Sequence, residues 1–83
     1  MSETAAPEVV LLTRPGCHLC EDARQVLDRV GKDLGVAWHE RSAEDEPELA
    51  ARFGEEIPVL FIDGVQRDFW TIDETRLRRL LEA

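Results

Sequence analysis

Cys17 and Cys20 are the residues of this chain whose type and spacing point most clearly to chemistry. They follow an apolar run that stops at Pro15 and Gly16, so we expect them where a strand ends and a helix begins. The first turn of a helix has unpaired backbone N–H groups and the positive end of the helix dipole, and both stabilise a thiolate. Cys17 is therefore the predicted nucleophile. Cys20 lies one turn further on, nearer the buried side, from where its sulfur could attack a mixed disulfide formed at Cys17.

Two other uses of this cysteine pair stay open. The pair could bind a metal or an iron–sulfur cluster that bridges a dimer, or it could be idle in a non-catalytic adaptor. A structural zinc site needs about four ligands, whereas the chain offers only His18, His39 and carboxylates beside the cysteines, without a second CxxC motif. We therefore expect no closed zinc site within one chain and favour redox chemistry, which a CxxC motif at a strand-to-helix junction indicates.

Length and charge argue against several other classes of function. The chain has 83 residues, enough for one domain, and its 43% hydrophobic and 34% charged residues are typical of a globular protein. The 18 acidic and 10 basic residues give a formal net charge of −8, which opposes binding to a phosphate backbone or an anionic membrane. Because the apolar run at 9–12 is too short for a signal sequence or a membrane span, we expect a cytoplasmic monomer without nucleic-acid or membrane partners.

The pattern of apolar residues predicts four strands and three helices. Strands are expected over residues 8–13, 36–41, 59–62 and 65–68, with a hairpin turn at Asp63-Gly64. Helices are expected from Cys17 to Gly31 or Lys32, over a short segment capped by Gly54, and after a capping box at 71–74. The order βαβαββα describes an α/β fold with a four-stranded mixed sheet flanked by helices. Residues 1–7 are expected to form a flexible tail and residues 8–83 a single domain.

The aromatic residues are assigned mainly to packing. Trp38, Phe53, Phe61 and Phe69 are expected to be buried or half-buried, because large apolar side chains favour the interior. Trp70 follows the predicted hairpin and is a candidate for the rim of the site.

Two stretches make the chain resemble the short bacterial glutaredoxin-like family of the thioredoxin fold. They are TRPGCHLCEDAR at 13–24 and IPVLFIDG at 57–64. The resemblance implies that Cys17 is the nucleophile, that Cys20 resolves the mixed disulfide, and that Pro58 is cis and faces both sulfurs. It also implies that the backbone of Ile57 pairs with the substrate.

The activity that this resemblance implies is thiol-disulfide exchange. The substrate would be a disulfide in a protein or in a small molecule, reduced by way of a mixed disulfide. No bound cofactor is expected. An external reductant would regenerate the dithiol, and the candidates are glutathione, another low-molecular-weight thiol and thioredoxin reductase.

Residues around the motif differ from those of the family members that use glutathione. His18 and Leu19 replace their Pro-Tyr pair, while Arg14 matches a basic residue that contacts the glycine carboxylate of glutathione. Glu56 and Asp68 stand beside the expected glutathione groove, where their charge would repel this anionic peptide, so we expect weak glutathione binding. The predicted substrate-binding residues are Arg14, His18, Ile57 and Pro58.

Overall fold

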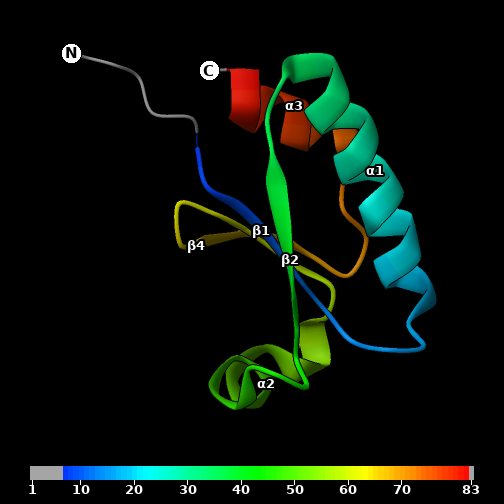
Figure 1. Cartoon of the computed structure of the whole chain (residues 1–83), viewed down its shortest axis with the longest axis vertical. Coiled ribbons are helices and arrows are strands. Elements are labelled where there is room, and N and C mark those ends of the chain that lie inside the picture. Colours follow the sequence, from blue (N-terminus) through cyan, green and yellow to red (C-terminus); the bar gives the residue numbers. More distant parts are fainter. Residues whose placement is uncertain (1–6, 83) are drawn as a thin grey trace.

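The strands and helices follow one another in the predicted order (Figure 1). A computed structural model describes residues 7–82, so the predicted tail at 1–7 lies outside the described residues except for Pro7. The strands are β1 (Val9–Thr13), β2 (Trp38–Ser42), β3 (Val59–Ile62) and β4 (Val65–Phe69). The helices are α1 (His18–Leu34), α2 (Pro47–Phe53) and α3 (Glu74–Glu82), and a short 3₁₀ helix, η1 (Gly54–Glu56), follows α2.

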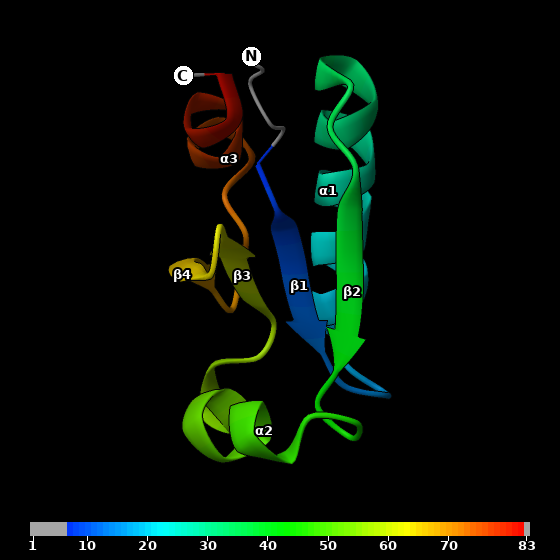
Figure 2. The same ribbon diagram turned by 60° about the vertical axis from the view of Figure 1, so that its left-hand side comes forward.

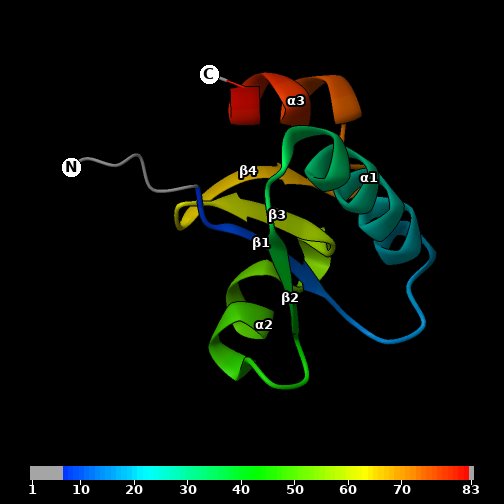
Figure 3. The ribbon, with the colours of Figure 1, turned by 45° about the horizontal axis from the view of Figure 1, so that its top comes forward.

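The four strands form one mixed sheet in the order β2-β1-β3-β4 (Figure 2). β1 pairs with β2 in parallel, as a crossover through α1 allows, and with β3 in antiparallel orientation. The hairpin adds β4 at the edge, antiparallel to β3. Figure 3 shows α1 and α3 on one face of the sheet and α2 on the other. The predicted four-stranded mixed sheet flanked by helices is confirmed.

The larger core lies between the sheet and the helices α1 and α3. Successive side chains of a strand point to opposite faces, so β1 and β3 each give alternate residues to this core. Its buried members are Val9, Leu11, Ala23, Leu27, Val30, Leu60, Ile62, Ile72 and Leu77. Ala23, Leu27 and Val30 recur at helical spacing on one face of α1, which is why the apolar pattern located this helix. No helix within residues 7–82 is long and apolar enough to cross a membrane.

A smaller core lies on the opposite face, near the end of the sheet where β1 stops. Its buried members are Leu12, Cys20, Ile57 and Val59. Phe53 of α2 and Phe61 of β3 pack against this cluster, and their ring centroids lie 5.2 Å apart in an edge-to-face arrangement. The second cysteine therefore packs with the residue that precedes Pro58.

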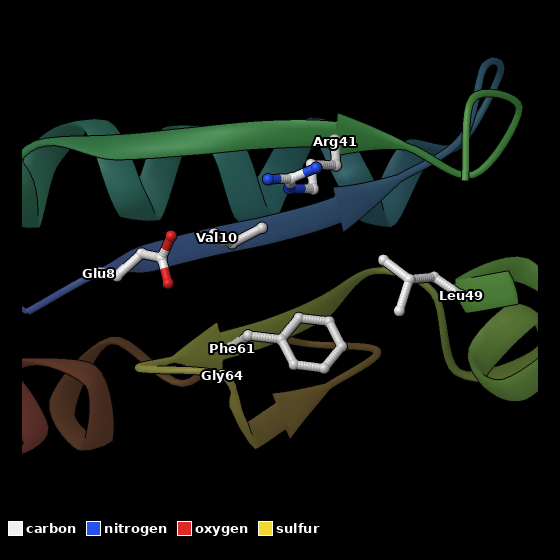
Figure 4. A pocket seen from close by; sticks show the side chains of 6 residues that line it. All are labelled: Glu8, Val10, Arg41, Leu49, Phe61 and Gly64. Atoms are coloured by element: carbon white, nitrogen blue, oxygen red, sulfur yellow. The ribbon is translucent and has the colours of Figure 1, made fainter.

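The rest of the opposite face carries an open groove of about 220 Å³ (Figure 4). Val10 and Phe61 line it, with Leu49 and Arg41 beside them, and none of its lining residues belongs to the segments 14–20 or 57–58. On the edge strand β4, Phe69 is exposed. The predicted burial of Phe69 is wrong, because an edge strand has only one neighbouring strand to cover its side chains.

The end of α1 lies at Leu34, beyond the predicted end at Gly31 or Lys32. Gly35 has a left-handed φ of 68°, and the N–H of Val36 donates to Gly31 O at 2.9 Å, which is the bond of a Schellman cap. Because Val36 belongs to this cap, β2 begins at Trp38 and not at the predicted residue 36.

Of the two other predicted helix ends, one is confirmed and one is wrong. Gly54 is the C-cap of α2, as predicted, with a helical φ of −57° from which the chain continues into η1. The N-terminus of α3 is capped by Asp73, whose Oδ1 accepts from the N–H of Arg76 at 3.1 Å. Thr71, the predicted first residue of a capping box, lies outside this arrangement.

Glu74 connects α1 to α3 instead of completing the predicted capping box. Its carboxylate lies 2.7 Å from Arg29 of α1 and 2.9 Å from Arg78 of α3. Hydrogen bonds from Arg29 and then Arg78 lower the pKa of Glu74 to about 2. Arg78 also pairs with Asp33 at 2.7 Å, so two arginines and two carboxylates hold the helices together.

Replacing Gly31 with alanine is expected to destabilise the fold. A Cβ at this position would lie 2.6 Å from the backbone oxygen of Val36, so the connection between α1 and β2 would have to shift. Overpacking of this kind costs about 1–3 kcal/mol. Denaturant titration would record it as a lower free energy of unfolding.

Gly54→Ala is the matched control for this substitution. Gly54 has a helical φ, and a Cβ there would meet open space. The change is expected to leave stability as it is or to raise it by about 0.4–1 kcal/mol, because it restricts the unfolded chain. Equal effects of the two substitutions would contradict the close approach at Gly31.

Candidate active site

Cys17 is the N-cap of α1. A turn in which Gly16 has a φ of 70° leads from the end of β1 to this position. The Cys17 sulfur accepts a hydrogen bond from the N–H of Cys20 at 3.1 Å, as the oxygen of a serine or aspartate does at other helix starts. Cys17 is half-buried whereas Cys20 is buried, so Cys17 is the more accessible of the two residues.

Cys20 is buried in the smaller core, as its place on the apolar side of α1 predicts. Burial, and after it the hydrogen bond to Cys17, raises the pKa of the Cys20 thiol to about 11. A hydrogen bond with the Arg14 backbone and the charge of Arg24 act in the opposite direction. At neutral pH Cys20 is therefore a protonated thiol behind the more accessible sulfur of Cys17.

Ile57 and Pro58 lie at the same end of the sheet as the cysteines. The peptide bond between them is cis. Pro58 directly precedes β3, whose first residue, Val59, pairs with Leu12 near the end of β1. Ile57 packs in the cluster that contains Cys20 and against which Cys17 also packs. The structure thus brings together Cys17, Cys20, Ile57 and Pro58, four of the six residues predicted for the site.

The other two predicted residues, Arg14 and His18, flank Cys17 along the chain and are exposed. Arg14 contributes its backbone to the surroundings of the Cys20 sulfur. His18 is the first residue of α1. Their roles in binding a substrate stay predictions.

A polar network next to the cysteines was not predicted. The hydroxyl of Thr13, which is buried at the end of β1, donates to Glu40 of β2 at 2.6 Å. Arg24 of α1 donates to both oxygens of the same carboxylate, the shortest bond being 2.7 Å. Arg24 lies four residues after Cys20, a spacing that the sequence does show, but its pairing with Glu40 depends on where β2 lies.

The position of Trp70 was only partly predicted. Its backbone N–H lies 2.9 Å from Pro58 O and 3.2 Å from Glu56 O, and its indole N–H donates to Glu55 O at 2.9 Å. Its φ is 62°, in the left-handed region that bulky residues rarely adopt. Trp70 is therefore attached to the loop that leads into Pro58, at the rim that the sequence suggested.

One chain offers few ligands for the alternative in which the cysteine pair binds a metal. Within residues 7–82, no three side chains of histidine, cysteine, aspartate or glutamate come together in a way that could hold a metal ion. A metal or cluster bound by Cys17 and Cys20 would thus require further ligands from another molecule.

Known proteins of similar sequence and structure place the chain in a family. An uncharacterized protein of Mycobacterium tuberculosis, Rv0508, is 35% identical over 77 residues, which are 87% of this chain and 79% of the relative. A structural genomics target protein from X. campestris has a TM-score of 0.73 at 28% identity, over 89% of this chain and 95% of that chain. A thioredoxin from Halobacterium salinarum has a TM-score of 0.66 at 23% identity, over 93% of this chain and 73% of that chain.

The likeness to thioredoxin confirms the predicted fold. The family model described as glutaredoxin-like domain (DUF836) matches residues 8–82. The chain therefore belongs to the glutaredoxin-like domain family (DUF836), with a thioredoxin fold and its cysteine pair at Cys17 and Cys20.

Proposed function

We propose that the protein is a thiol-disulfide oxidoreductase that reduces disulfides through Cys17 and Cys20. The observation that carries this proposal is the hydrogen bond from the Cys20 N–H to the half-buried Cys17 sulfur, with the Cys20 thiol buried one turn behind it. An accessible sulfur stabilised by a helix start, with a second thiol in reach, is the arrangement that thiol-disulfide exchange needs.

In the first step the Cys17 thiolate attacks one sulfur of a substrate disulfide, R–S–S–R′. A Cys17–S–S–R mixed disulfide forms, and R′–S⁻ leaves and takes a proton from water. The N–H of Cys20 and the start of α1 stabilise the charge on the Cys17 sulfur before the attack. The substrate reaches this sulfur from the solvent side, because the smaller core fills the other side.

In the second step Cys20 gives up its proton to water and attacks the Cys17 sulfur. The Cys17–Cys20 disulfide forms and R–S⁻ leaves, so that two electrons have passed from the dithiol to the substrate. The mixed disulfide no longer carries the Cys17 thiolate, whose hydrogen bond and charge both raise the pKa of Cys20. Cys20 therefore loses its proton more easily at the stage where it has to attack.

An external reductant closes the cycle. Two molecules of a low-molecular-weight thiol, or a dithiol reductase, would reduce the Cys17–Cys20 disulfide by the same exchange. Neither step requires a bound cofactor. Glutathione, another small thiol and thioredoxin reductase are the candidates to compare.

Substituting the two cysteines separately tests the proposed order of attack. Cys17→Ser is expected to reduce hydroxyethyl disulfide only at the uncatalysed rate, because the attacking sulfur is gone. Cys20→Ser is expected to form the mixed disulfide and to accumulate it, since the resolving sulfur is gone. Intact-mass spectrometry under non-reducing conditions would detect the trapped adduct on Cys17.

The assay is run with glutathione and, in parallel, with thioredoxin reductase as the source of electrons. Activity with one of them identifies the type of reductant. Reduction at the wild-type rate by Cys17→Ser, or an adduct that forms on Cys20 in Cys17→Ser as readily as on Cys17 in Cys20→Ser, would show that the proposed assignment is wrong.

The pKa of Cys20 is expected to fall when Cys17 is blocked. A carbamidomethyl group on Cys17 is a thioether that Cys20 cannot displace, and it removes the thiolate whose hydrogen bond and charge add to burial in raising the pKa of Cys20 to about 11. Resolution of the mixed disulfide, which lacks the same thiolate, should accordingly accelerate with rising pH and level off above a pKa that lies below that of the free dithiol. The pH dependence of the Cys20 Cβ chemical shift, recorded with and without the block, measures the difference.

Arg24→Gln is expected to slow resolution at neutral pH by up to about fivefold, because an exposed charge contributes roughly 0–1 kcal/mol. The loss of its charge raises the pKa of Cys20, since Arg24 favours the thiolate. Arg76→Gln on α3, an exposed arginine remote in sequence from both cysteines, serves as the control. An unchanged or lower pKa of Cys20 in Arg24→Gln would contradict this role.

A further inference from the structure

The end of the sheet that holds the cysteines also carries an exposed aromatic pair. Leu12 pairs with Val59, and Val59 pairs with Phe69, so the segments that adjoin these residues meet at one end of the sheet. In Figure 1 the orange segment after β4 turns beside the start of β3. Trp70 and Phe69 are 53% and 41% exposed, and their ring centroids lie 5.0 Å apart.

Large exposed apolar side chains are concentrated at this end. Among the described residues they are Leu19, Val65, Phe69 and Trp70. Leu19 stands between the two cysteines, and Trp70 is bonded to Pro58 O, so both lie in segments of the candidate active site. Only Val65, next to the hairpin turn, lies at the opposite end of β4. An exposed apolar patch beside a nucleophile is a surface on which a partner can dock.

The charge around the aromatic pair indicates what kind of partner fits. Glu55 and Glu56 adjoin Trp70 through their backbone oxygens, and Asp68 precedes Phe69. The carboxylates of Glu56 and Asp68 accept hydrogen bonds only from neutral groups, namely the Gln66 amide and two backbone N–H groups. The ion pairs of residues 7–82 use other carboxylates, which are those of Glu40, Glu74, Glu46 and Asp33.

We infer that Phe69, Trp70 and the neighbouring carboxylates form a docking surface for a basic segment of a protein substrate, next to the cysteine that Cys17 attacks. A lysine or arginine over the Trp70 ring would gain a cation–π interaction. The same cation would lie beside the loop that carries Glu55 and Glu56, whose carboxylates form no ion pair in the described part of the chain, although Arg52 lines the hollow that these two residues share. The inference rests on the proposed function and names the substrate class of that same site.

The same carboxylates oppose the binding of an acidic partner. A substrate with carboxylates beside its cysteine would meet three like charges at Glu55, Glu56 and Asp68, and the aromatic rings would offer it only apolar contact. Glutathione is one such anionic molecule. A neutral small disulfide would touch Cys17 without reaching the aromatic pair, so it reports on the chemistry alone.

Two peptide disulfides that differ only in the residues beside the cysteine test this inference. One carries lysine and arginine there, and the other carries glutamate and aspartate, while hydroxyethyl disulfide serves as the neutral reference. The wild-type protein is expected to reduce the basic peptide with a kcat/KM at least about tenfold higher than the acidic one at low salt. The ratio should shrink at high salt, because salt screens exposed charges.

Variants then show which residues cause the preference for the basic peptide. Trp70→Ala and the double variant Glu55→Gln/Glu56→Gln are each expected to lower kcat/KM for the basic peptide about fivefold. The double variant should retain the wild-type rate on hydroxyethyl disulfide, which also shows that it is folded. Trp70→Ala, at the rim of the site, is judged by the ratio of its kcat/KM values for the two peptides, which should fall. Glu82→Gln, at the end of α3, is the charge control and should change neither rate.

The outcomes separate the two proposals. If the wild-type protein fails to reduce hydroxyethyl disulfide, the proposed function is wrong. If it reduces hydroxyethyl disulfide but treats both peptides alike, or prefers the acidic one, the docking surface is wrong and the proposed function stands. A preference for the basic peptide that the double variant Glu55→Gln/Glu56→Gln retains in full would equally overturn the inference.

Discussion

The pairing of β1 with β3, and of β3 with β4, is the constraint on which the site depends. The row formed by Leu12, Val59 and Phe69 aligns the end of β1 with the start of β3 and the end of β4. A shift of one residue in either pairing would turn alternate side chains to the other face. A shift of β3 against β1 would also displace Ile57, which precedes β3, from Cys20, which follows β1 in α1.

Much of the fold could be predicted because its signals are local. The apolar spacing of α1, the continuous apolar strands and the Asp63-Gly64 turn each depend on a few neighbouring residues. The predicted end of α1 and start of α3 were wrong because residues outside the local pattern decide them. Gly31 resembles a stop signal but stays helical, because Val36 folds back onto it. Glu74 resembles a capping acid but binds Arg29, which is 45 residues away in the sequence.

The two cysteines could be placed from the sequence alone, since a motif at a strand-to-helix junction specifies its own geometry. Burial of Cys20 followed from the apolar side of α1. The bond from Arg24 to Glu40 could not be predicted, because it depends on the register of β2 against β1. The exposure of Phe69 was missed because an edge strand and a central strand have similar sequences.

The bonds that hold Trp70 have a consequence for how a substrate is selected. The indole N–H and the backbone N–H are already occupied in the free protein, so the ring has little rotational freedom left to lose when a partner arrives. Ordering of side chains is a large entropic penalty in most associations, about 0.5–1.5 kcal/mol for each mobile side chain. At the docking surface that we infer, that penalty falls mainly on the substrate, so a recognition segment that is already ordered would bind more tightly than a flexible one.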